Sequence, residues 1–366
     1  MSPSSGIRRI AISTGGGDAP GLNAVIRAAV LAALNRGWQC VGIRDGYNGL
    51  LLPEQYVGGG LIPLTRESVR GITPLGGTIL GTTNRGNPLK FPVCASDGTM
   101  TEVDRCDELV QLFRLHQIDA LISVGGDGSL GIAAVLANKG LRVVGVPKTI
   151  DNDLDGTVIT FGFDTAVAFA TESIDRLHST AEAHRRVMVV EVMGRYAGWI
   201  ALNAGVSASA DAILIPEIPY DLDIVARRIR RCEDEGQKHA IVVVAEGAKP
   251  KGGTISLARA RVAGAAERLG GIGEHLTADL EALTGHEARC VVLGHLLRGG
   301  SPSTFDRLLS LRFGAAAVRA LEEGESGVMV ALDPPVVKYV PLEDATRRMK
   351  TVPLDCDSIR TARDVG

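Results

Sequence analysis

The sequence lacks an excess of basic residues, a close pair of cysteines and a long apolar run. Its formal net charge is −3, so it has none of the basic surplus that is typical of nucleic-acid-binding proteins. Its six cysteines are scattered without any CxxC pair, which argues against a zinc site or a disulfide framework and favours buried thiols in a reducing compartment. The first residues, MSPSSGIRR, contain no apolar segment long enough for a signal peptide or a membrane span. We therefore expect a cytoplasmic protein with no nucleic-acid or membrane partner.

The length and the glycine content suggest an enzyme-sized protein. The chain has 366 residues, which is long enough for roughly two domains of ordinary size. It contains 45 glycines, and glycine is the residue of tight turns and of close backbone approaches to a ligand.

Short apolar runs bounded by glycine alternate with helix-like segments, which predicts parallel sheets and an α/β fold of the doubly wound kind. Several runs are apolar throughout, as is typical of strands covered by helices on both faces. We expect the segment after Leu332 to be a packed strap or surface cover with little chemistry. The runs that we expect to be strands are 10–13, 39–43, 120–124, 141–146, 187–192, 212–215, 240–245 and 290–293. The expected helices include residues 23–35 and the segment that follows the glycines at 125–128 and ends at about Asn138.

Two glycine clusters follow expected strands, where ligands bind in such sheets. Gly15 to Gly21 reads GGGDAPG, and its backbone N–H groups could approach a phosphate, although a simple tight turn explains it nearly as well. Gly125 to Ser129 reads GGDGS. An aspartate among glycines at a strand end can hold magnesium while the backbone contacts phosphates, and the alternative is an N-capping aspartate.

A third cluster, Pro147 to Asp153, reads PKTIDND and follows the next expected strand. Two carboxylates two residues apart can divide the work of phosphoryl transfer. One accepts the proton of an attacking hydroxyl and the other helps to organise the metal. The alternative is an ordinary acidic loop, but the position directly after an apolar strand favours a functional site.

Basic residues near strand ends could bind an anionic substrate, because arginine suits bidentate phosphate contacts. Taken singly, an arginine of this kind is more often a solvated surface residue. Glu246 follows a strongly apolar strand and could accept hydrogen bonds from sugar hydroxyls, while His295 is a weaker candidate. The arginines in question are Arg185, Arg186, Arg195, Arg289 and Arg298.

From about Arg9 to Gly314 the chain resembles the bacterial-type phosphofructokinase family, and the joint occurrence of the motifs in family order is highly specific. The resemblance implies magnesium-assisted phosphoryl transfer to the 1-hydroxyl of fructose 6-phosphate, a reaction of glycolysis. The motifs that carry it are GGDAPG with Asn23, GGDGS, TIDND, MGRYAG, AEG and GHLLRGGSP.

The resemblance also implies a role for each matching position. Asp127 is implied as the magnesium-associated carboxylate, and Asp151 as the catalytic base supported by Thr149 and Arg195. The implied nucleotide side comprises Gly17, Arg85, Gly126, Asp127, Gly128 and Ser129. The implied fructose 6-phosphate site comprises Thr149, Asp151, Asp153, Arg186, Met193, Gly194, Arg195, Glu246, Arg289, His295 and Arg298.

Two features of quaternary and domain structure follow from the same resemblance. Arg186 and Arg289 resemble arginines that reach a neighbouring subunit's sugar-phosphate site, so we expect a homo-oligomer, a homotetramer or a homodimer. We expect two doubly wound Rossmann-like domains. Residues 1–162 with about 297–345 would bind the donor phosphate, and residues 163–296 with the C-terminal tail would bind fructose 6-phosphate.

In the family that the chain resembles, the choice of phosphate donor is associated with two positions, and this chain has a mixed pair of residues there. ATP users of the family usually have glycine at the positions of Gly128 and Lys148, and pyrophosphate users usually have aspartate and lysine there. Glycine at 128 leaves space for the nucleotide and Lys148 blocks nothing, so we expect ATP, with pyrophosphate as the alternative.

Other readings remain open at this stage. The loop around Arg85 differs from the shorter family loop, so that assignment is open by one residue. An NAD or lipid kinase shares GGDG but not the sugar-phosphate motifs. A catalytically silent, nucleotide-binding regulatory subunit is the alternative of another class, against which intact Asp127, Asp151 and Arg195 argue.

Overall fold

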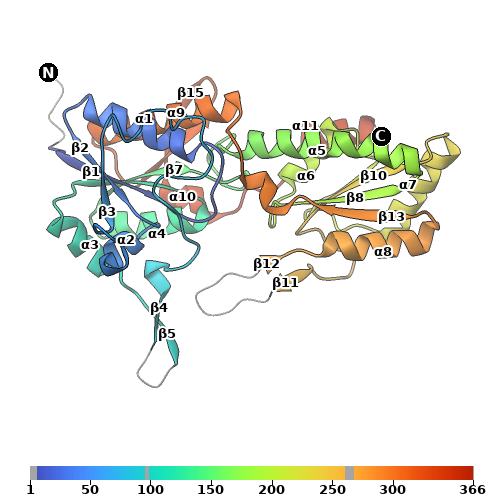
Figure 1. Ribbon diagram of the computed structural model, residues 1–366, viewed down its shortest axis with the longest axis horizontal. Helices are drawn as coiled ribbons and strands as arrows, with labels where there is room; N and C mark the ends of the chain where they lie inside the picture. The colour runs from blue at the N-terminus through green and yellow to red at the C-terminus, as the bar shows by residue number, and fades with distance from the viewer. Residues whose placement is uncertain (1–5, 95–98, 260–267, 366) are drawn as a thin grey trace.

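The computed structural model describes residues 6–94, 99–259 and 268–365. These residues form two α/β lobes that lie side by side, and the long helix α5 (Phe163–His184) leads from the first lobe into the second (Figure 1). After the second sheet the chain returns to the first lobe through α9 (Thr304–Glu323) and then crosses again to end near α5.

The first lobe is built on a seven-stranded sheet in the order β15-β14-β7-β6-β1-β2-β3. Its inner strands are parallel, and the edge strands β3 and β15 run antiparallel to their neighbours. Helices α1 and α9 cover one face, and α2, α3, α4 and α10 cover the other. The strands are β1 (Arg9–Thr14), β2 (Gln39–Ile43), β3 (Leu61–Leu64), β6 (Ala120–Gly125), β7 (Arg142–Pro147), β14 (Val328–Asp333) and β15 (Val336–Pro341), and the helices not yet given are α1 (Leu22–Leu34), α2 (Asn48–Leu51), α3 (Cys106–Leu115), α4 (Asp127–Asn138) and α10 (Leu342–Arg347).

The second lobe has a four-stranded parallel sheet in the order β13-β8-β10-β9. Helices α5, α6 and α11 pack on one face, and α7 and α8 on the other. Both lobes are therefore doubly wound, as the sequence predicts. The elements are β8 (Val187–Val192), β9 (Ala212–Leu214), β10 (Ala240–Ala245), β13 (Ala288–Val292), α6 (Trp199–Ser207), α7 (Leu222–Asp234), α8 (Ile272–Thr284) and α11 (Asp357–Asp364).

Two hairpins project from the lobes on the same side of the molecule (Figure 1). They are formed by β4 (Phe91–Cys94) with β5 (Met100–Val103), and by β11 (Leu257–Arg259) with β12 (Arg268–Leu269). Three short 3₁₀ helices complete the described chain, η1 (Pro53–Gln55), η2 (Pro88–Lys90) and η3 (Gly294–Arg298).

The central strands are fully covered because each sheet has helices on both faces. Every residue of β6, β8 and β10 is buried. These runs are therefore almost wholly apolar and do not alternate, with Ser123 in β6 and Glu191 in β8 as buried polar exceptions. All eight predicted strands are present, with ends that differ by no more than two residues. The expectation for the tail is wrong in part, because residues 336–341 form the edge strand β15 before the chain continues as α10 and α11.

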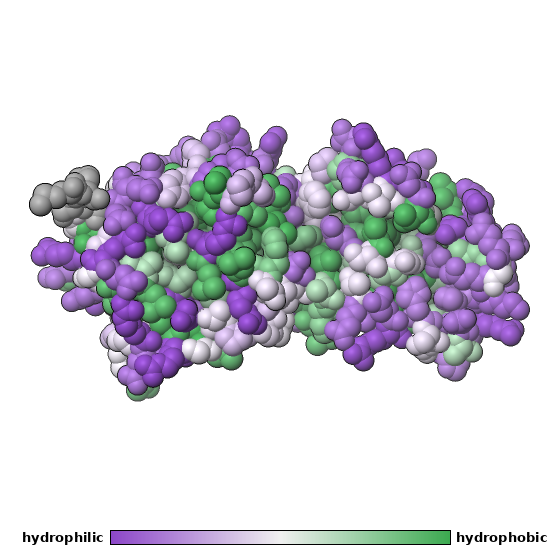
Figure 2. Space-filling view, turned by 90° about the horizontal axis from the view of Figure 1, so that it is seen from above, coloured by the Kyte–Doolittle hydropathy of each residue, from purple (hydrophilic) through white to green (hydrophobic). Residues whose placement is uncertain are grey.

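The outer ends of both lobes are polar. Seen from above, hydrophilic residues dominate the two far ends, and hydrophobic residues show mainly toward the middle of the molecule (Figure 2). Within the described part of the chain, no helix combines the length and the apolar character needed to cross a membrane.

Candidate active site

The two glycine clusters lie against each other at the carboxyl ends of β1 and β6. The Gly15 N–H donates a hydrogen bond of 3.0 Å to the Val124 carbonyl oxygen. The Ser129 side chain, in the first turn of α4, fits against both clusters. A Cβ atom at Gly125 would lie 2.2 Å from Ser129 Cβ, and one at Gly15 would lie 2.6 Å from Ser129 Oγ. These two glycines are therefore required by the close contact between the loops.

Lys148 lies beneath the first glycine loop. Its side chain is buried, and its ammonium group donates a hydrogen bond to the Gly17 carbonyl oxygen. The pKa of Lys148 is lowered to about 8, first by burial and then by the positive charge of Arg298, while the charge of Asp151 acts in the opposite direction. The lysine therefore places an ammonium group between the glycine loop and the carboxylates.

Asp151 and Asp153 form a buried carboxylate pair beyond β7. Burial raises the pKa of Asp151, and the charge of Glu246 raises it too, against Arg298, Arg195 and Lys148. The pKa of Asp153 is raised to about 7, first by burial and then by the charges of Asp151 and Asp127. Asp151 Oδ1 is buried without a hydrogen-bond partner. An unpartnered carboxylate oxygen in this position is free to accept a proton from a bound hydroxyl group.

Backbone geometry around this pair is held by polar contacts. The Asp151 N–H donates to Thr149 Oγ1 at 3.1 Å, and Thr160 Oγ1 donates to the Thr149 carbonyl oxygen at 2.7 Å. Asn152 lies between the two aspartates with a left-handed φ of 52°. Its Oδ1 accepts hydrogen bonds from the Thr160 N–H at 3.1 Å and from Lys350 Nζ at 2.9 Å.

The second lobe contributes the turn after β8. Glu246 Oε1 accepts hydrogen bonds from the Arg195 N–H at 3.0 Å and from the Gly194 N–H at 3.4 Å. Burial raises the pKa of Glu246, and the two N–H donors lower it. Arg195 has a left-handed φ of 50°, and a Cβ atom at Gly247 would lie 1.9 Å from the Arg195 carbonyl oxygen. The position of Arg195 is thus fixed by its two neighbours, and Met193 packs against the core just before it.

Arg298 connects the two lobes at the end of η3. Its Nη1 donates to the Asp18 carbonyl oxygen at 3.1 Å, and a Cβ atom at Gly17 would lie 2.8 Å from the same nitrogen. The guanidinium group therefore covers the glycine loop and also lowers the pKa of Asp151. His295 lies exposed on the same short helix.

Arg186 and Arg289 lie at the other end of the second sheet. Arg186 precedes β8, and Arg289 pairs with Met188 near the start of that strand. Both arginines are ion-paired with Glu287, Arg186 at 2.8 Å. The structure of this single chain therefore does not bring them together with Asp151.

Arg85 is not in contact with the glycine loops. The residue is exposed, and its N–H donates to Thr83 Oγ1 at 2.9 Å within its own turn. Asn84 lies closer, because its Oδ1 is 4.0 Å from the position that a Cβ atom at Gly16 would occupy. The geometry thus favours Asn84, one residue earlier, as the side chain of this loop that faces the site.

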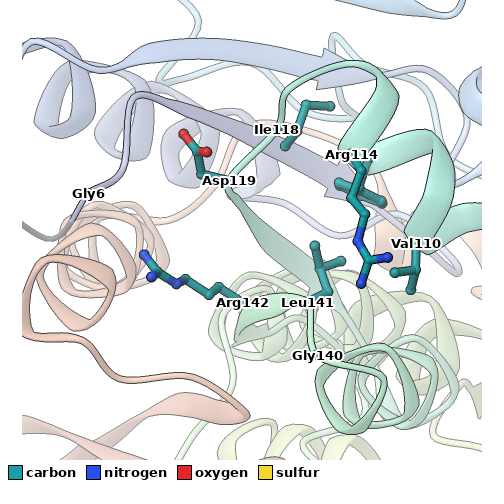
Figure 3. A pocket seen from close by; sticks show the side chains of 9 residues that line it. Gly6, Val110, Arg114, Ile118, Asp119, Gly140, Leu141 and Arg142 are labelled. Atoms are coloured by element: carbon teal, nitrogen blue, oxygen red, sulfur yellow. The ribbon is translucent and has the colours of Figure 1, made fainter.

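A cavity of about 250 Å³ lies at the opposite edge of the first sheet (Figure 3). Its lining includes Asp119, directly before β6, and Leu141 and Arg142 at the start of β7. Because ligands of doubly wound sheets bind at the carboxyl ends of the strands, we assign the functional site to the residues around Asp151 and not to this cavity.

Two side chains that sequence reasoning missed support the site from behind. Lys350 contacts Asn152, and Glu217 accepts hydrogen bonds from Gly198 at 3.0 and 3.2 Å and from Val352 at 2.9 Å. Lys350 and Asn152 are 198 positions apart, and no local pattern connects them.

The carboxylates of the site suit a magnesium ion. Asp127 is exposed at the start of α4, and its negative charge raises the pKa of Asp153. Within residues 6–94, 99–259 and 268–365, no three His, Cys, Asp or Glu side chains are grouped closely enough to hold a metal ion. Magnesium is usually held by one or two carboxylates together with water and substrate phosphates, so Asp127 with an unpartnered carboxylate nearby fits it.

The arrangement as a whole defines a class of protein. Glycine loops at the carboxyl ends of parallel strands, a buried carboxylate pair, and cations from both lobes are the parts that phosphoryl transfer requires. The fold and the site thus define a phosphotransferase of the doubly wound type.

Comparison with known proteins identifies the family. Residues 9–321 match the family described as "Phosphofructokinase", and the chain belongs to this family.

Similar proteins include users of either donor. The chain is 50% identical over 98% of its length, and 97% of the other protein, to the "ATP-dependent 6-phosphofructokinase" of Chloroflexus aurantiacus. It is 48% identical over 95% of its length, and 97% of the other protein, to the "Pyrophosphate--fructose 6-phosphate 1-phosphotransferase" of Amycolatopsis mediterranei. Among solved structures, the Pichia pastoris phosphofructokinase in the T-state matches with a TM-score of 0.78 and 30% identity. That match covers 93% of this chain and only 36% of the yeast chain.

Proposed function

We propose that the protein is an ATP-dependent 6-phosphofructokinase, which transfers a phosphoryl group to the 1-hydroxyl of fructose 6-phosphate and yields fructose 1,6-bisphosphate for glycolysis. The observation that carries the proposal is the unpartnered, buried oxygen of Asp151 between the glycine loops of one lobe and Arg195 of the other. The 50% identity to the Chloroflexus enzyme over 98% of the chain supports the same activity.

Asp151 acts in this proposal as the base that accepts the proton of the 1-hydroxyl, with Thr149 and Asp153 as its neighbours. Arg195, Glu246 and the residues around them bind the sugar phosphate. Their fixed geometry is typical of a preorganised site, since charged groups held in place stabilise developing charge without reorganisation.

The donor phosphates bind against the glycine loops, with Gly17, Gly126, Gly128 and Ser129 at the carboxyl ends of β1 and β6. Asp127 would hold magnesium, which supplies neutralisation of the charge on the transferring phosphoryl group. Lys148 and Arg298 place two further positive charges beside the same loop.

Gly128 and Lys148 are the mixed pair at the donor site, and we propose that the chain belongs to a subgroup of the family with this Gly/Lys pair. A Cβ atom at Gly128 would meet no heavy atom within 4 Å, so the space beside the loop is open for a nucleotide. Lys148 is directed into the Gly17 carbonyl oxygen and leaves that space free. Both features favour ATP, with Gly128 as the deciding residue.

Pyrophosphate is the second candidate donor, because Lys148 is the residue that pyrophosphate users have and a pyrophosphate-dependent relative is 48% identical. The alternative of another class is a regulatory subunit that binds nucleotide without turnover. One assay separates the three: purified protein with fructose 6-phosphate and magnesium receives ATP or pyrophosphate, and fructose 1,6-bisphosphate is measured. Product with ATP alone supports the proposal, product with pyrophosphate alone reassigns the donor, and no product with either favours the silent subunit.

Gly128→Asp tests the steric and electrostatic argument directly. The position has open space and no positive φ, so we expect a folded protein whose kcat/KM with ATP falls by about 10²-fold, as expected when an acidic group faces the phosphates. Gly131→Asp, one turn further along α4 and equally uncrowded, is the matched control and should keep its activity. An unchanged ATP activity in Gly128→Asp would remove Gly128 as the deciding residue.

We further propose the domain division and assembly that the resemblance implies. The donor domain comprises residues 1–162 and about 297–345, and the sugar-phosphate domain comprises residues 163–296 and the tail. Arg186 and Arg289 lie at the amino end of the second sheet, where this single chain does not bring them together with Asp151, so the role that the resemblance implies would require a second copy of the chain. This supports a homo-oligomer in which they serve the neighbouring subunit's site.

A further inference from the structure

The C-terminal segment crosses from one lobe to the other directly behind the carboxylate pair. We call residues 348–352 the strap. It follows α10 of the first lobe and leads into α11 of the second (Figure 1). Met349 forms a β-bridge with Leu154, and the Lys350 N–H donates to the Asp153 carbonyl oxygen at 2.8 Å. The strap is therefore bonded to the backbone of the loop that contains Asp151 and Asp153.

The ammonium group of Lys350 donates three hydrogen bonds to the loop that follows Asp151. Its Nζ donates to Asn152 Oδ1 at 2.9 Å, to the Thr157 carbonyl oxygen at 3.0 Å and to the Val158 carbonyl oxygen at 2.9 Å. An ammonium group has three donors, and each has an acceptor here. The pKa of Lys350 is lowered to about 8 by burial, against the charges of Asp153 and Asp155. A buried cation with three acceptors is a costly and specific arrangement.

The acceptor Asn152 is the residue whose conformation sets the relation between the two aspartates. Its left-handed φ of 52° turns the chain between Asp151 and Asp153. Asparagine adopts this region more readily than other residues with a Cβ atom, but still at some cost. Two hydrogen bonds to Oδ1, from Thr160 and Lys350, hold the side chain and hence the turn.

The other side of the strap is anchored in the second lobe. Trp199 Nε1 donates to the Lys350 carbonyl oxygen at 2.9 Å, and Lys350 Nζ lies 5.7 Å from the centre of the Trp199 ring. The Val352 N–H donates to Glu217 Oε1 at 2.9 Å, and Glu217 also accepts from the Gly198 N–H, three residues after Arg195. The strap thus contacts, through direct bonds, the loop of the base and the segment that follows Arg195.

We propose that Lys350 is a positioning residue for phosphoryl transfer: acting through Asn152, it holds the turn that places Asp151 and Asp153, and it ties that turn to the Arg195 side of the site. The inference rests on the proposed function for its kinetic consequence, and its structural part stands independently. The residue touches neither substrate nor the reacting atoms. Its effect is therefore on the geometry of the base, where a misplacement of about 1 Å costs about 10²-fold in rate.

The first test is Lys350→Met, which keeps the length of the side chain and removes its three donors. We expect kcat for fructose 1,6-bisphosphate formation to fall by about 30- to 100-fold, while KM for fructose 6-phosphate and for ATP changes by less than about threefold. Arg348→Met is the matched control, because it removes an exposed ion pair with Asp155 from the same strap, and it should keep kcat within about twofold. Equal losses in the two variants would overturn the specific role of Lys350.

A double-mutant cycle tests whether Lys350 acts through Asn152. Asn152→Gly removes the acceptor and tolerates the left-handed backbone. If the two residues act as a unit, the double variant loses no more than the worse single variant; additive losses would mean independent roles and would overturn the proposal. If Lys350→Met folds poorly, Asn152→Gly alone still tests the turn, and an unchanged kcat in that variant would overturn the proposal.

Hydrogen exchange separates this inference from the proposed function. Amides of residues 149–161 should exchange faster in Lys350→Met than in the wild type and in Arg348→Met, with no substrate present. If the wild type produces no fructose 1,6-bisphosphate, the proposed function fails while the exchange result still tests the strap. Unchanged exchange with unchanged kcat would refute the positioning role.

Discussion

The two sides of the site are built in different ways. On the first lobe, the proposed donor side consists mainly of glycine loops, and a side chain at Gly128 would stand in open space. On the second lobe, Arg195 is held in a left-handed conformation by Glu246 and by close contact with Gly247. The first lobe is therefore open at Gly128, although Gly15 and Gly125 are crowded by Ser129, whereas the second lobe is crowded at Gly247.

The difference fits what the proposed function requires each side to recognise. A chain of phosphates can be bound by N–H groups and by a helix N-terminus, which need space for close approach more than particular side chains. A sugar phosphate has hydroxyls and a phosphate in fixed relation, so its site needs charged side chains in fixed positions. Asp151 lies between the two, with its environment set by both lobes.

The largest effect on activity is expected from a substitution of Asp151, which lies between the two lobes. Asp151→Ser removes the proposed base, and we expect kcat to fall by about 10³-fold or more, with fructose 6-phosphate binding largely intact. Because burial raises the pKa of Asp151, the charged carboxylate costs stability in the free protein, so the variant should be at least as stable as the wild type at pH 8. Steady-state kinetics, equilibrium binding and thermal unfolding measure the three quantities. Loss of binding equal to the loss of kcat would contradict the assignment of Asp151 as a base.

The next largest effect is expected from a substitution at the crowded position Gly247, in contrast to the open position Gly128. In Gly247→Ala the new methyl group would lie 1.9 Å from the Arg195 carbonyl oxygen, so the backbone must shift, at a cost of about 1–3 kcal/mol. We expect a lower free energy of unfolding and a raised KM for fructose 6-phosphate, since Arg195 moves with its carbonyl group. Denaturant unfolding and steady-state kinetics check both.

Gly128→Ala is the partner of that experiment at the open position. No heavy atom lies within 4 Å of the new methyl group, and the φ angle is ordinary. Its free energy of unfolding should stay the same or rise by about 0.4–1 kcal/mol, because the unfolded chain loses freedom. Similar destabilisation in both variants would remove the distinction between the two positions.

The same comparison explains how much could be predicted from the sequence. The first lobe's loops are local patterns, glycine clusters directly after apolar strands, and the structure brings GGGDAPG, GGDGS and PKTIDND together as the fold class requires. Arg186 and Arg289 resemble arginines of the family's sugar-phosphate site, yet the structure places them at the amino end of the second sheet and does not bring them together with Asp151. Lys350 could not be found, since its contact with Asn152 spans 198 positions. The edge strand β15 was also missed because its run is only partly buried.

The smallest effect concerns the pH dependence of the carboxylate pair. The pKa of Asp153 is raised to about 7, by burial first and by the charges of Asp151 and Asp127 second. Burial also raises the pKa of Asp151, the proposed base. Because the base must be deprotonated, kcat/KM should fall as the pH drops and the carboxylate pair takes up a proton. Asp153→Asn removes a like charge beside Asp151, lowers the pKa of that carboxyl, and should move the acid limb of the profile to lower pH.

The pH dependence of stability tests the same carboxylate pair independently, and the direction of its change follows from the raised pKa of Asp153. A carboxyl group whose folded pKa is raised binds its proton more tightly in the folded state, so its contribution to stability is present at pH 4 and is lost as the pH rises to about 7. The melting temperature of Asp153→Asn should therefore decrease less than that of the wild type between pH 5 and pH 8. Asp155→Asn, two positions along, is the matched control, because Arg348 holds the pKa of Asp155 below its usual value, and its acid limb should not move. An acid limb that stays in place in Asp153→Asn would mean that the charge on Asp153 does not reach the base, and the pair would have to be treated as two separate groups.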